Sequence, residues 1–171
     1  RCDWSCVIMA LALENITQAY QRIVATLETQ RASSSVHQAF LDLKNHLVSK
    51  GITQLQVLPF AATAIDTGAD GAVLLDSAVA KFYAVYAKRV SDVDTTAAFL
   101  NVADDATNNA TAADVVVVIR TNSANEESYA IIPAGEALSA GIVVSATTAP
   151  AGTTESAATE SSNGFVVVGA A

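Results

Sequence analysis

The sequence predicts an α+β protein in which an N-terminal helical hairpin, or arm, is followed by an antiparallel, jelly-roll-like β-sandwich. Three observations support this fold class. Apolar residues recur at helical spacing as far as about residue 56, the remaining chain carries short runs rich in Val, Ile, Phe and Tyr, and turn-forming residues separate those runs. We therefore divide the chain into a helical arm, residues 1–56, and a sandwich, residues 57–171.

Two amphipathic helices account for the arm. Each carries one apolar stripe with spacings of four, three and four residues. The stripes consist of Ile16, Tyr20, Ile23 and Leu27 in the first helix and Val36, Phe40, Leu43 and Leu47 in the second. Because two helices alone bury little surface, these eight side chains are candidate contacts with a partner or a second subunit. The alternative is that they pack within the chain.

The ends of the second helix are marked by capping residues. Ser33-Ser34-Ser35 offers hydroxyl groups for its N-cap, and Gly51 follows its last apolar position. Glycine adopts the left-handed conformation that commonly ends a helix. We therefore expect the second helix to lie between these two signals.

Seven strands are predicted in the sandwich. They are residues 72–77, 81–89, 98–103, 114–120, 128–132, 141–147 and 165–169. Turn formers separate them, among them Pro133-Ala134-Gly135. No helical stretch of about ten residues intervenes, which excludes a parallel βαβ arrangement.

Two of these strands carry more detailed predictions. Alternation divides residues 81–89 into one face with Phe82, Ala84 and Tyr86 and another with Tyr83, Val85 and Ala87. Both faces are apolar enough to be covered. The continuous apolar run at residues 115–119 is typical of a central strand buried on both sides.

Charge is distributed unevenly over the 171 residues, whose net charge is −8. Residues 1–90 carry eight Lys and Arg against seven Asp and Glu, whereas residues 91–171 carry Arg120 against ten acids. Nucleic-acid binding depends on clustered basic residues, and a membrane span needs about 20 consecutive apolar residues. We expect neither a nucleic-acid partner nor a membrane partner. The cysteines, Cys2 and Cys6, are expected to be free thiols.

One short motif points to catalysis. The segment from Ala64 to Asp70, which contains Asp66-Thr67-Gly68, resembles the catalytic loop of retroviral-type aspartic proteases. Those enzymes also need a glycine-rich flap and a later hydrophobic-Gly segment that leads into a helix. The chain has eight glycines, and Val167-Val168-Gly169 lies two residues from its end. We interpret the motif as a turn and predict no catalytic residue and no enzymatic activity.

The candidate metal ligands do not form a recognised pattern. Acidic groups occur at Asp66, Asp70 and Asp76, and again at Asp92, Asp94, Asp104 and Asp105. The first group lacks the alternate spacing of a calcium-binding EF-hand loop. The second is an alternative calcium-binding loop, but we interpret both groups as solvated loop charges. His37 and His46 lie nine residues apart, which places them on opposite faces of a helix. We predict no metal site and no cofactor.

From Gly71 to Gly169 the order of features resembles the β-sandwich of small virion proteins of tailed bacteriophages, which include head decoration (cement) proteins and fibre subunits. The matching segments are Gly71-Ala72-Val73-Leu74-Leu75, Lys81-Phe82-Tyr83-Ala84-Val85-Tyr86-Ala87, Ala98-Phe99-Leu100-Asn101-Val102-Ala103-Asp104-Asp105-Ala106, Ile131-Ile132-Pro133-Ala134-Gly135-Glu136 and Ala140-Gly141-Ile142-Val143-Val144-Ser145-Ala146-Thr147-Thr148. The helical arm has no counterpart in this family, and the turn between the first two strands lacks the usual glycine.

The resemblance implies a structural protein rather than an enzyme. Its expected role is capsid decoration, as a homotrimer bound to the major capsid protein on the outer surface of the virion. The acidic sandwich would then face solvent, and the less charged arm would lie on the shell. The alternatives are a head or tail fibre subunit, and a bacterial adhesin or carbohydrate-binding sandwich.

Overall fold

The computed structural model describes residues 11–61, 72–75, 80–90, 98–106, 114–121, 125–147 and 162–171. Its helices are α1 (Ile16–Thr29) and α2 (Ser34–Ser49). Its strands are β1 (Glu14–Asn15), β2 (Gln54–Phe60), β3 (Ala72–Leu75), β4 (Ala80–Arg89), β5 (Ala98–Ala103), β6 (Val115–Thr121), β7 (Glu127–Leu138), β8 (Ile142–Thr147) and β9 (Ser162–Ala170).

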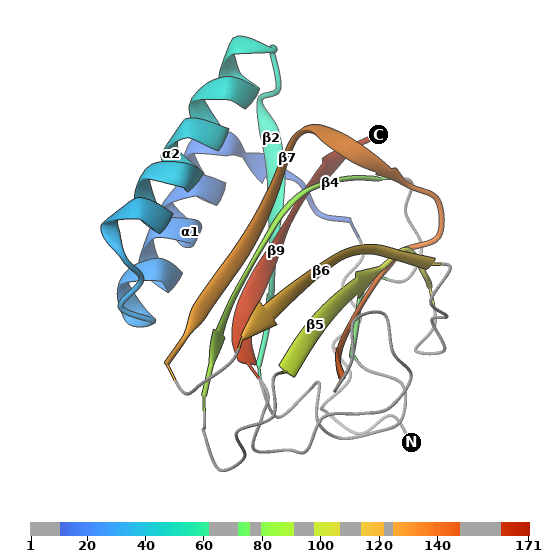
Figure 1. Ribbon diagram of the computed structural model, residues 1–171. Coiled ribbons are helices and arrows are strands. Elements are labelled where there is room, and N and C mark those ends of the chain that lie inside the picture. Colours follow the sequence, from blue (N-terminus) through green and yellow to red (C-terminus); the bar gives the residue numbers. More distant parts are fainter. Residues whose placement is uncertain are drawn as a thin grey trace, which may run out of the picture.

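The strands form two antiparallel sheets, in the orders β1-β2-β9-β4-β7 and β3-β8-β5-β6, and the helices lie on the first (Figure 1). The pairs are nested along the chain: β2 pairs with β9, β3 with β8, β4 with β7 and β5 with β6. A long hairpin folded over in this way, with alternate pairs in opposite sheets, has the jelly-roll order. The predicted fold class, helices followed by an antiparallel sandwich, is confirmed.

Two apolar clusters lie on opposite faces of the five-stranded sheet. One fills the sandwich and includes Phe82, Val85 and Val166; the other lies under the helices and includes Tyr86 and Phe165. Side chains of β4 and β9 therefore alternate between two buried layers, which explains their nearly continuous apolar sequences. The molecule has three layers: helices, five-stranded sheet and four-stranded sheet.

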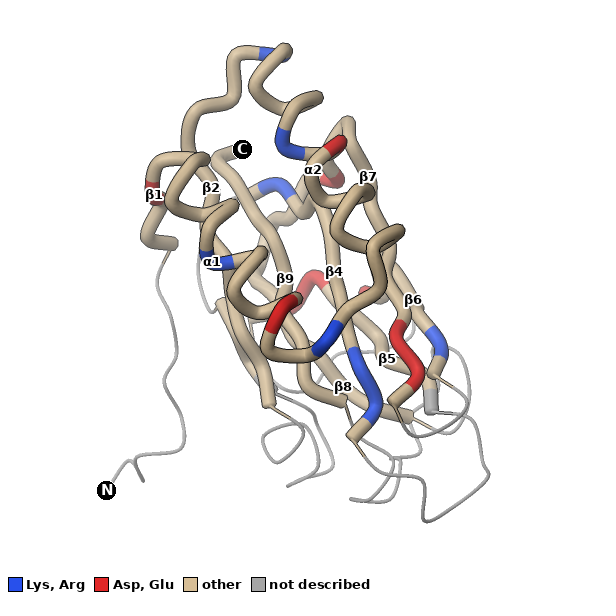
Figure 2. The backbone as a smooth tube through the Cα atoms, turned by 90° about the vertical axis from the view of Figure 1, so that its left-hand side faces the viewer, with Lys and Arg blue, Asp and Glu red and all other residues tan. Residues whose placement is uncertain are grey.

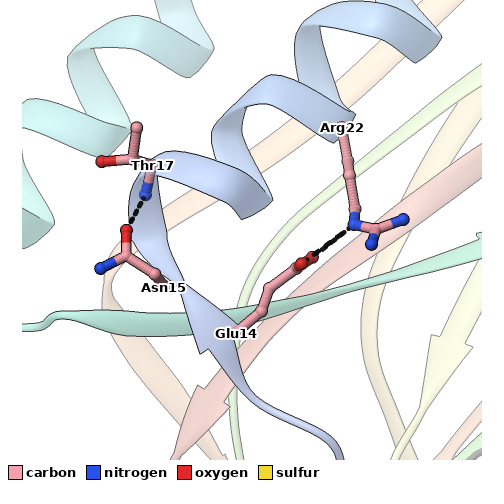
Figure 3. Close-up of polar contacts among 4 residues, drawn as sticks. All are labelled: Glu14, Asn15, Thr17 and Arg22. Atoms are coloured by element: carbon pink, nitrogen blue, oxygen red, sulfur yellow. Dashed lines mark hydrogen bonds and ion pairs between the residues drawn. The ribbon is translucent and has the colours of Figure 1, made fainter.

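Local capping fixes where α1 begins. The side-chain oxygen of Asn15 accepts a hydrogen bond from the backbone N–H of Thr17 at 2.8 Å, as Figure 3 shows. Glu14 reaches forward to Arg22, with Nε 2.8 Å from a carboxylate oxygen. Because Glu14 and Asn15 also pair with β2, these contacts hold the first turn of the helix against the sheet edge.

The expected ends of α2 are confirmed, with one difference. Ser33 is the N-cap residue, but its hydroxyl contacts the hydroxyl of Ser35 at 3.0 Å rather than a backbone N–H. Gly51 has a φ of 78°. The N–H groups of Gly51 and Ile52 donate to the carbonyls of Val48 and Leu47, which is the Schellman arrangement.

The end of α1 has the same arrangement without a glycine. Arg31 has a φ of 53° and donates to the carbonyl of Glu28, while Ala32 donates to that of Leu27. A left-handed conformation costs a residue with a Cβ about 1–2 kcal/mol. We expect Arg31→Gly to raise the free energy of unfolding by about 0.5–1 kcal/mol, measured by urea denaturation. Arg31→Ala keeps the strain and is the control; an equal gain in both variants would contradict this explanation.

The predicted faces of β4 are confirmed for Phe82 and Tyr83 and are wrong from Ala84 onward. The pairing of β4 with β9 shifts by one residue between Phe82 and Ala84. Tyr83 is therefore the extra residue of a β-bulge, and both Tyr83 and Ala84 face the helices, while Val85 joins Phe82 inside the sandwich. Glycines on both neighbouring strands leave room for the tyrosine ring, since a Cβ on Gly135 or Gly169 would lie 2.8 Å from it.

The sequence predicts a central strand for the valine run, but in the structure this run forms the edge strand β6. Its residues Val115 to Val118 are half-buried rather than buried. Val116 and Val117 pack on the sandwich core, and β6 also contacts β7 of the other sheet. The apolar composition therefore reflects contact between the edges of two sheets.

Two further boundaries differ from the sequence prediction. Pro133-Ala134-Gly135 is not a turn between strands but an irregular part of β7, where Ile131 and Glu136 pair with β4 on either side of it. Proline is tolerated there because β7 is an edge strand of its sheet. The predicted boundary at residue 57 falls inside β2, a strand that the sequence analysis did not predict.

Candidate functional site

Most of the predicted partner contacts lie inside the chain's own core. Seven of the eight stripe residues, all except Tyr20, are buried. They pack against the helix-facing side of β4 and β9, including Tyr83, Tyr86 and Phe165. Tyr20 is half-buried, with the Nζ atom of Lys44 5.3 Å from its ring centroid. Intramolecular packing therefore accounts for these stripes.

The outer surface of the helical layer is polar and nearly neutral. Charged residues of both signs are spread over it in Figure 2. In the part of the chain that the structure describes, the exposed large apolar side chains are Val48 on α2, Val90 after β4 and Tyr129 on β7. They come from three different elements and supply no apolar docking groove.

A polar row lies beneath the turn that joins the helices. On β7, the carboxylate of Glu127 accepts a hydrogen bond from the backbone N–H of Ser33 at 3.0 Å and one from the hydroxyl of Tyr86 at 3.2 Å. On β4, the ammonium of Lys88 donates to the carbonyl of Gln30. The sheet thus holds both ends of the α1–α2 turn.

An aromatic row runs beside this polar row. Tyr86 lies opposite Tyr129 on β7 and opposite Phe165 on β9. The ring centroids of Tyr86 and Phe165 are 5.6 Å apart, and Phe40 of α2 covers Phe165 at 5.3 Å. Burial, and then the charge and hydrogen bond of Glu127, raise the pKa of the Tyr86 hydroxyl. The hydroxyl therefore stays a donor to Glu127 at physiological pH.

A buried arginine joins the two sheets at one end of the sandwich. Arg89, the last residue of β4, is only 1% exposed. Its Nη1 donates to the carbonyl of Thr121 on β6 at 3.3 Å, and its backbone pairs with Glu126 and Asn125. Since β6 belongs to the other sheet, this side chain is a structural tie across the core.

An acidic cavity of about 470 Å³ opens beside β6 and β7. Its lining consists of Asp104, Asp114, Val115, Val116, Glu136, Ala137 and Ser139. The carboxylate of Asp104 already accepts hydrogen bonds from the N–H groups of residues 139–141 and from the Ser139 hydroxyl. Among the described residues, no group of three or more His, Cys, Asp or Glu side chains is placed to hold a metal ion.

Asp104 gives the fold a pH dependence. Partial burial raises its pKa, but the donors at Ala140, Ser139 and Gly141 outweigh burial and leave the pKa below the usual 3.8. A lowered folded-state pKa means that this carboxylate stabilises the protein above the unfolded-state pKa, and that the stabilisation is lost as pH falls through the folded-state value. The cause is hydrogen bonding to the ionised form.

We expect Asp104→Asn to lower the free energy of unfolding by about 1–2 kcal/mol at pH 7. The difference from the wild type should begin to shrink below the unfolded-state pKa of about 4. It should disappear once pH falls through the lower folded-state pKa, where the folded wild-type carboxylate also becomes neutral. Urea denaturation at several pH values measures both effects. Glu28→Gln, an exposed position on α1, is the control. A difference for Asp104→Asn that is independent of pH would contradict this role.

Several candidate residues lie outside the described residues. They are Cys2, Cys6, Asp66, Asp70, Asp76, Asp92 and Asp94. The protease-like loop and the two calcium-type clusters are therefore not placed as units, and of the second cluster only Asp104 and Asp105 are described. His37 and His46 both lie on α2, as predicted.

Sequence reasoning missed the polar row. Glu127, Lys88 and Asn163 each stand two residues from an aromatic residue on the same strand, but that pattern has no meaning until the strand order is known. No helix in the described part of the chain is long and apolar enough to span a membrane. No protein-family model, curated protein or solved structure matches the chain.

Proposed function

We propose that the chain is a non-enzymatic virion protein of a tailed bacteriophage, which decorates the capsid by binding the major capsid protein on the outer shell. The observation that carries this proposal is the jelly-roll order of β2 to β9, because this arrangement recurs in viral capsid domains. The same fold also serves in lectins, so the proposal draws on the sequence resemblance of residues 71–169 as well.

The outer face of the helical layer is the proposed contact with the shell. Residues 11–51 carry four basic and three acidic side chains, whereas residues 52–171 carry four basic and thirteen acidic ones. An acidic sandwich directed into solvent favours solubility. The helices instead present short polar side chains such as Gln21 and Asn45, which are exposed and can hydrogen-bond without bringing a large charge into an interface.

Binding to empty capsids tests the proposal. The full chain is mixed with capsids assembled from the major capsid protein of the phage that encodes it, and co-sedimentation is measured. We expect saturable binding and a solution mass of about three times 17.6 kDa. Absence of binding to those capsids would refute the decoration role.

Two variants locate the contact. The double variant Gln21→Glu, Asn45→Glu adds charge to the outer helical face and should weaken capsid binding at least about tenfold. Ala134→Glu adds charge to an exposed position of β7 and is the control. If only Ala134→Glu weakens binding, the contact lies at the sandwich and the proposed face is wrong.

A carbohydrate-binding module is the second candidate, and Tyr129 is the observation that favours it. This side chain is 42% exposed on β7, and exposed aromatic rings are common platforms for sugars. Screening the chain on a glycan array tests this function. Binding that is lost in Tyr129→Ala, together with no binding to capsids, would favour this candidate over decoration.

A further inference from the structure

Lys88, Asn163 and Glu127 form one row across three neighbouring strands. Lys88 on β4 is the direct cross-strand partner of Asn163 on β9 and of Glu127 on β7. Opposite residues of an antiparallel pair point to the same face, with Cβ atoms about 5 Å apart. The row faces the helices, because Lys88 bonds to Gln30 and Glu127 to Ser33. The amide of Asn163 is therefore within reach of the flexible lysine side chain.

The surroundings of this row are partly closed to solvent. All three side chains are half-buried. The aromatic row that contains Tyr86 and Phe165 lies on one side, and the α1–α2 turn lies above. Two donors, the Ser33 N–H and the Tyr86 hydroxyl, hold the Glu127 carboxylate in place. The Glu127 carboxylate on β7 and the Asn163 carboxamide on β9 thus flank the Lys88 amine on β4. With limited access for water, this order is suited to loss of a proton from the amine and to its attack on the carboxamide.

We propose that this row is a modification site at which Lys88 and Asn163 join in an intramolecular isopeptide bond. Glu127 takes a proton from the Lys88 ammonium, and the Nζ lone pair then attacks the Asn163 side-chain carbonyl carbon. A bond forms between Nζ and Cγ, Glu127 returns its proton to Nδ2, and the bond between Cγ and Nδ2 breaks. The departing ammonia takes the second proton that Nζ loses. An ammonium ion and a carboxamide thus become a secondary amide and a released ammonium ion, and no atom is oxidised or reduced.

The structure holds the unlinked state, in which Lys88 donates to the carbonyl of Gln30. Rotation about the lysine side-chain bonds toward β9 brings Nζ to Asn163. The link joins the last strand of the jelly roll to β4 and closes the chain between residues 88 and 163. A covalent cross-link of this kind restrains the unfolded chain in the way that a disulfide does. This inference is independent of the proposed function.

Intact mass spectrometry of the purified full chain tests the bond. We expect a mass about 17 Da below that of the sequence, which corresponds to one lost ammonia. Lys88→Arg and Glu127→Gln keep the size of the side chain and should show the full sequence mass. A wild-type protein of full mass would overturn the proposal. So would a deficit that persists in Lys88→Arg, because a succinimide at Asn163-Gly164 has the same mass and needs no lysine.

Peptide mapping of the wild-type protein tests for the bond directly and does not depend on variants that fail to fold. Trypsin does not cleave after an acylated lysine, so the Lys88 peptide would span residues 82–89. A second protease that cleaves after Glu160 releases residues 161–171. The bond predicts one branched peptide that contains both segments. Recovery of the two segments only as separate, unmodified peptides would overturn it.

Discussion

Phe40→Ala is expected to lower the free energy of unfolding by about 3–4 kcal/mol. Phe40 is 1% exposed on α2, and its ring packs against Phe165 at 5.3 Å and against Tyr129 at 6.2 Å between centroids. Truncation to alanine leaves a cavity between helix and sheet that the surrounding rings cannot fill without leaving their own contacts. Guanidinium denaturation of the purified chain measures the loss, with the same denaturant dependence expected for both proteins.

The control for Phe40→Ala lies two turns further along the same helix. Val48 is 50% exposed, so Val48→Ala should change the free energy of unfolding by less than about 0.5 kcal/mol. Light scattering on both variants tests whether the apolar stripe of α2 packs in the core or forms an interface between subunits. If Phe40→Ala left stability unchanged but abolished self-association, the stripe would belong to an interface between subunits rather than to the core.

The helices could be predicted from the sequence because their signals are local. The spacing from Val36 to Leu47 and the glycine at residue 51 place α2 within a residue or two of its observed bounds. What covers the stripes could not be predicted in this way. The covering surface is made by β4 and β9, and its composition depends on the bulge at Tyr83. No periodic pattern in the sequence indicates that bulge.

The strands were recognisable, whereas their limits depend on pairing. Pro133-Ala134-Gly135 has the composition of a turn, yet β7 continues through it to Leu138 because Glu136 pairs with Phe82 beyond the irregularity. The valine run of β6 indicates burial correctly but not position, because an edge strand that contacts a second sheet can be as apolar as a central one. Tertiary contacts decide both cases.

The polar row shows the same limit for function. Glu127, Lys88 and Asn163 lie far apart in the sequence, and they meet only because β7, β4 and β9 are neighbours in that order. A shift of one residue in either pairing would turn one of them to the opposite face of the sheet. The chemistry proposed for the row is therefore a consequence of register, and a measurement of register tests it indirectly.

The stability of Gly164→Ala provides that test. The substitution should lower the free energy of unfolding by about 3 kcal/mol or more. Gly164 lies between Ala87 of β4 and Phe60 of β2. A Cβ atom there would overlap the carbonyl oxygen of Tyr86 and lie 2.7 Å from the Phe60 ring. Since the first of these atoms belongs to the backbone, relief requires β9 to move away from β4 and to break ladder hydrogen bonds. Guanidinium denaturation and the soluble yield of the variant measure the effect.

Gly51→Ala is the matched control, because it separates steric overlap from backbone strain. Gly51 has a φ of 78°, but a Cβ atom at this position would meet nothing within 4 Å, so its substitution should cost only about 1 kcal/mol. We expect the order Gly164→Ala, then Gly51→Ala, then wild type in increasing stability. If Gly164→Ala were the milder change, β9 would not pack between β2 and β4 in this register. Asn163 would then no longer lie opposite Lys88, and the proposed bond would lose its geometric basis together with the sheet order.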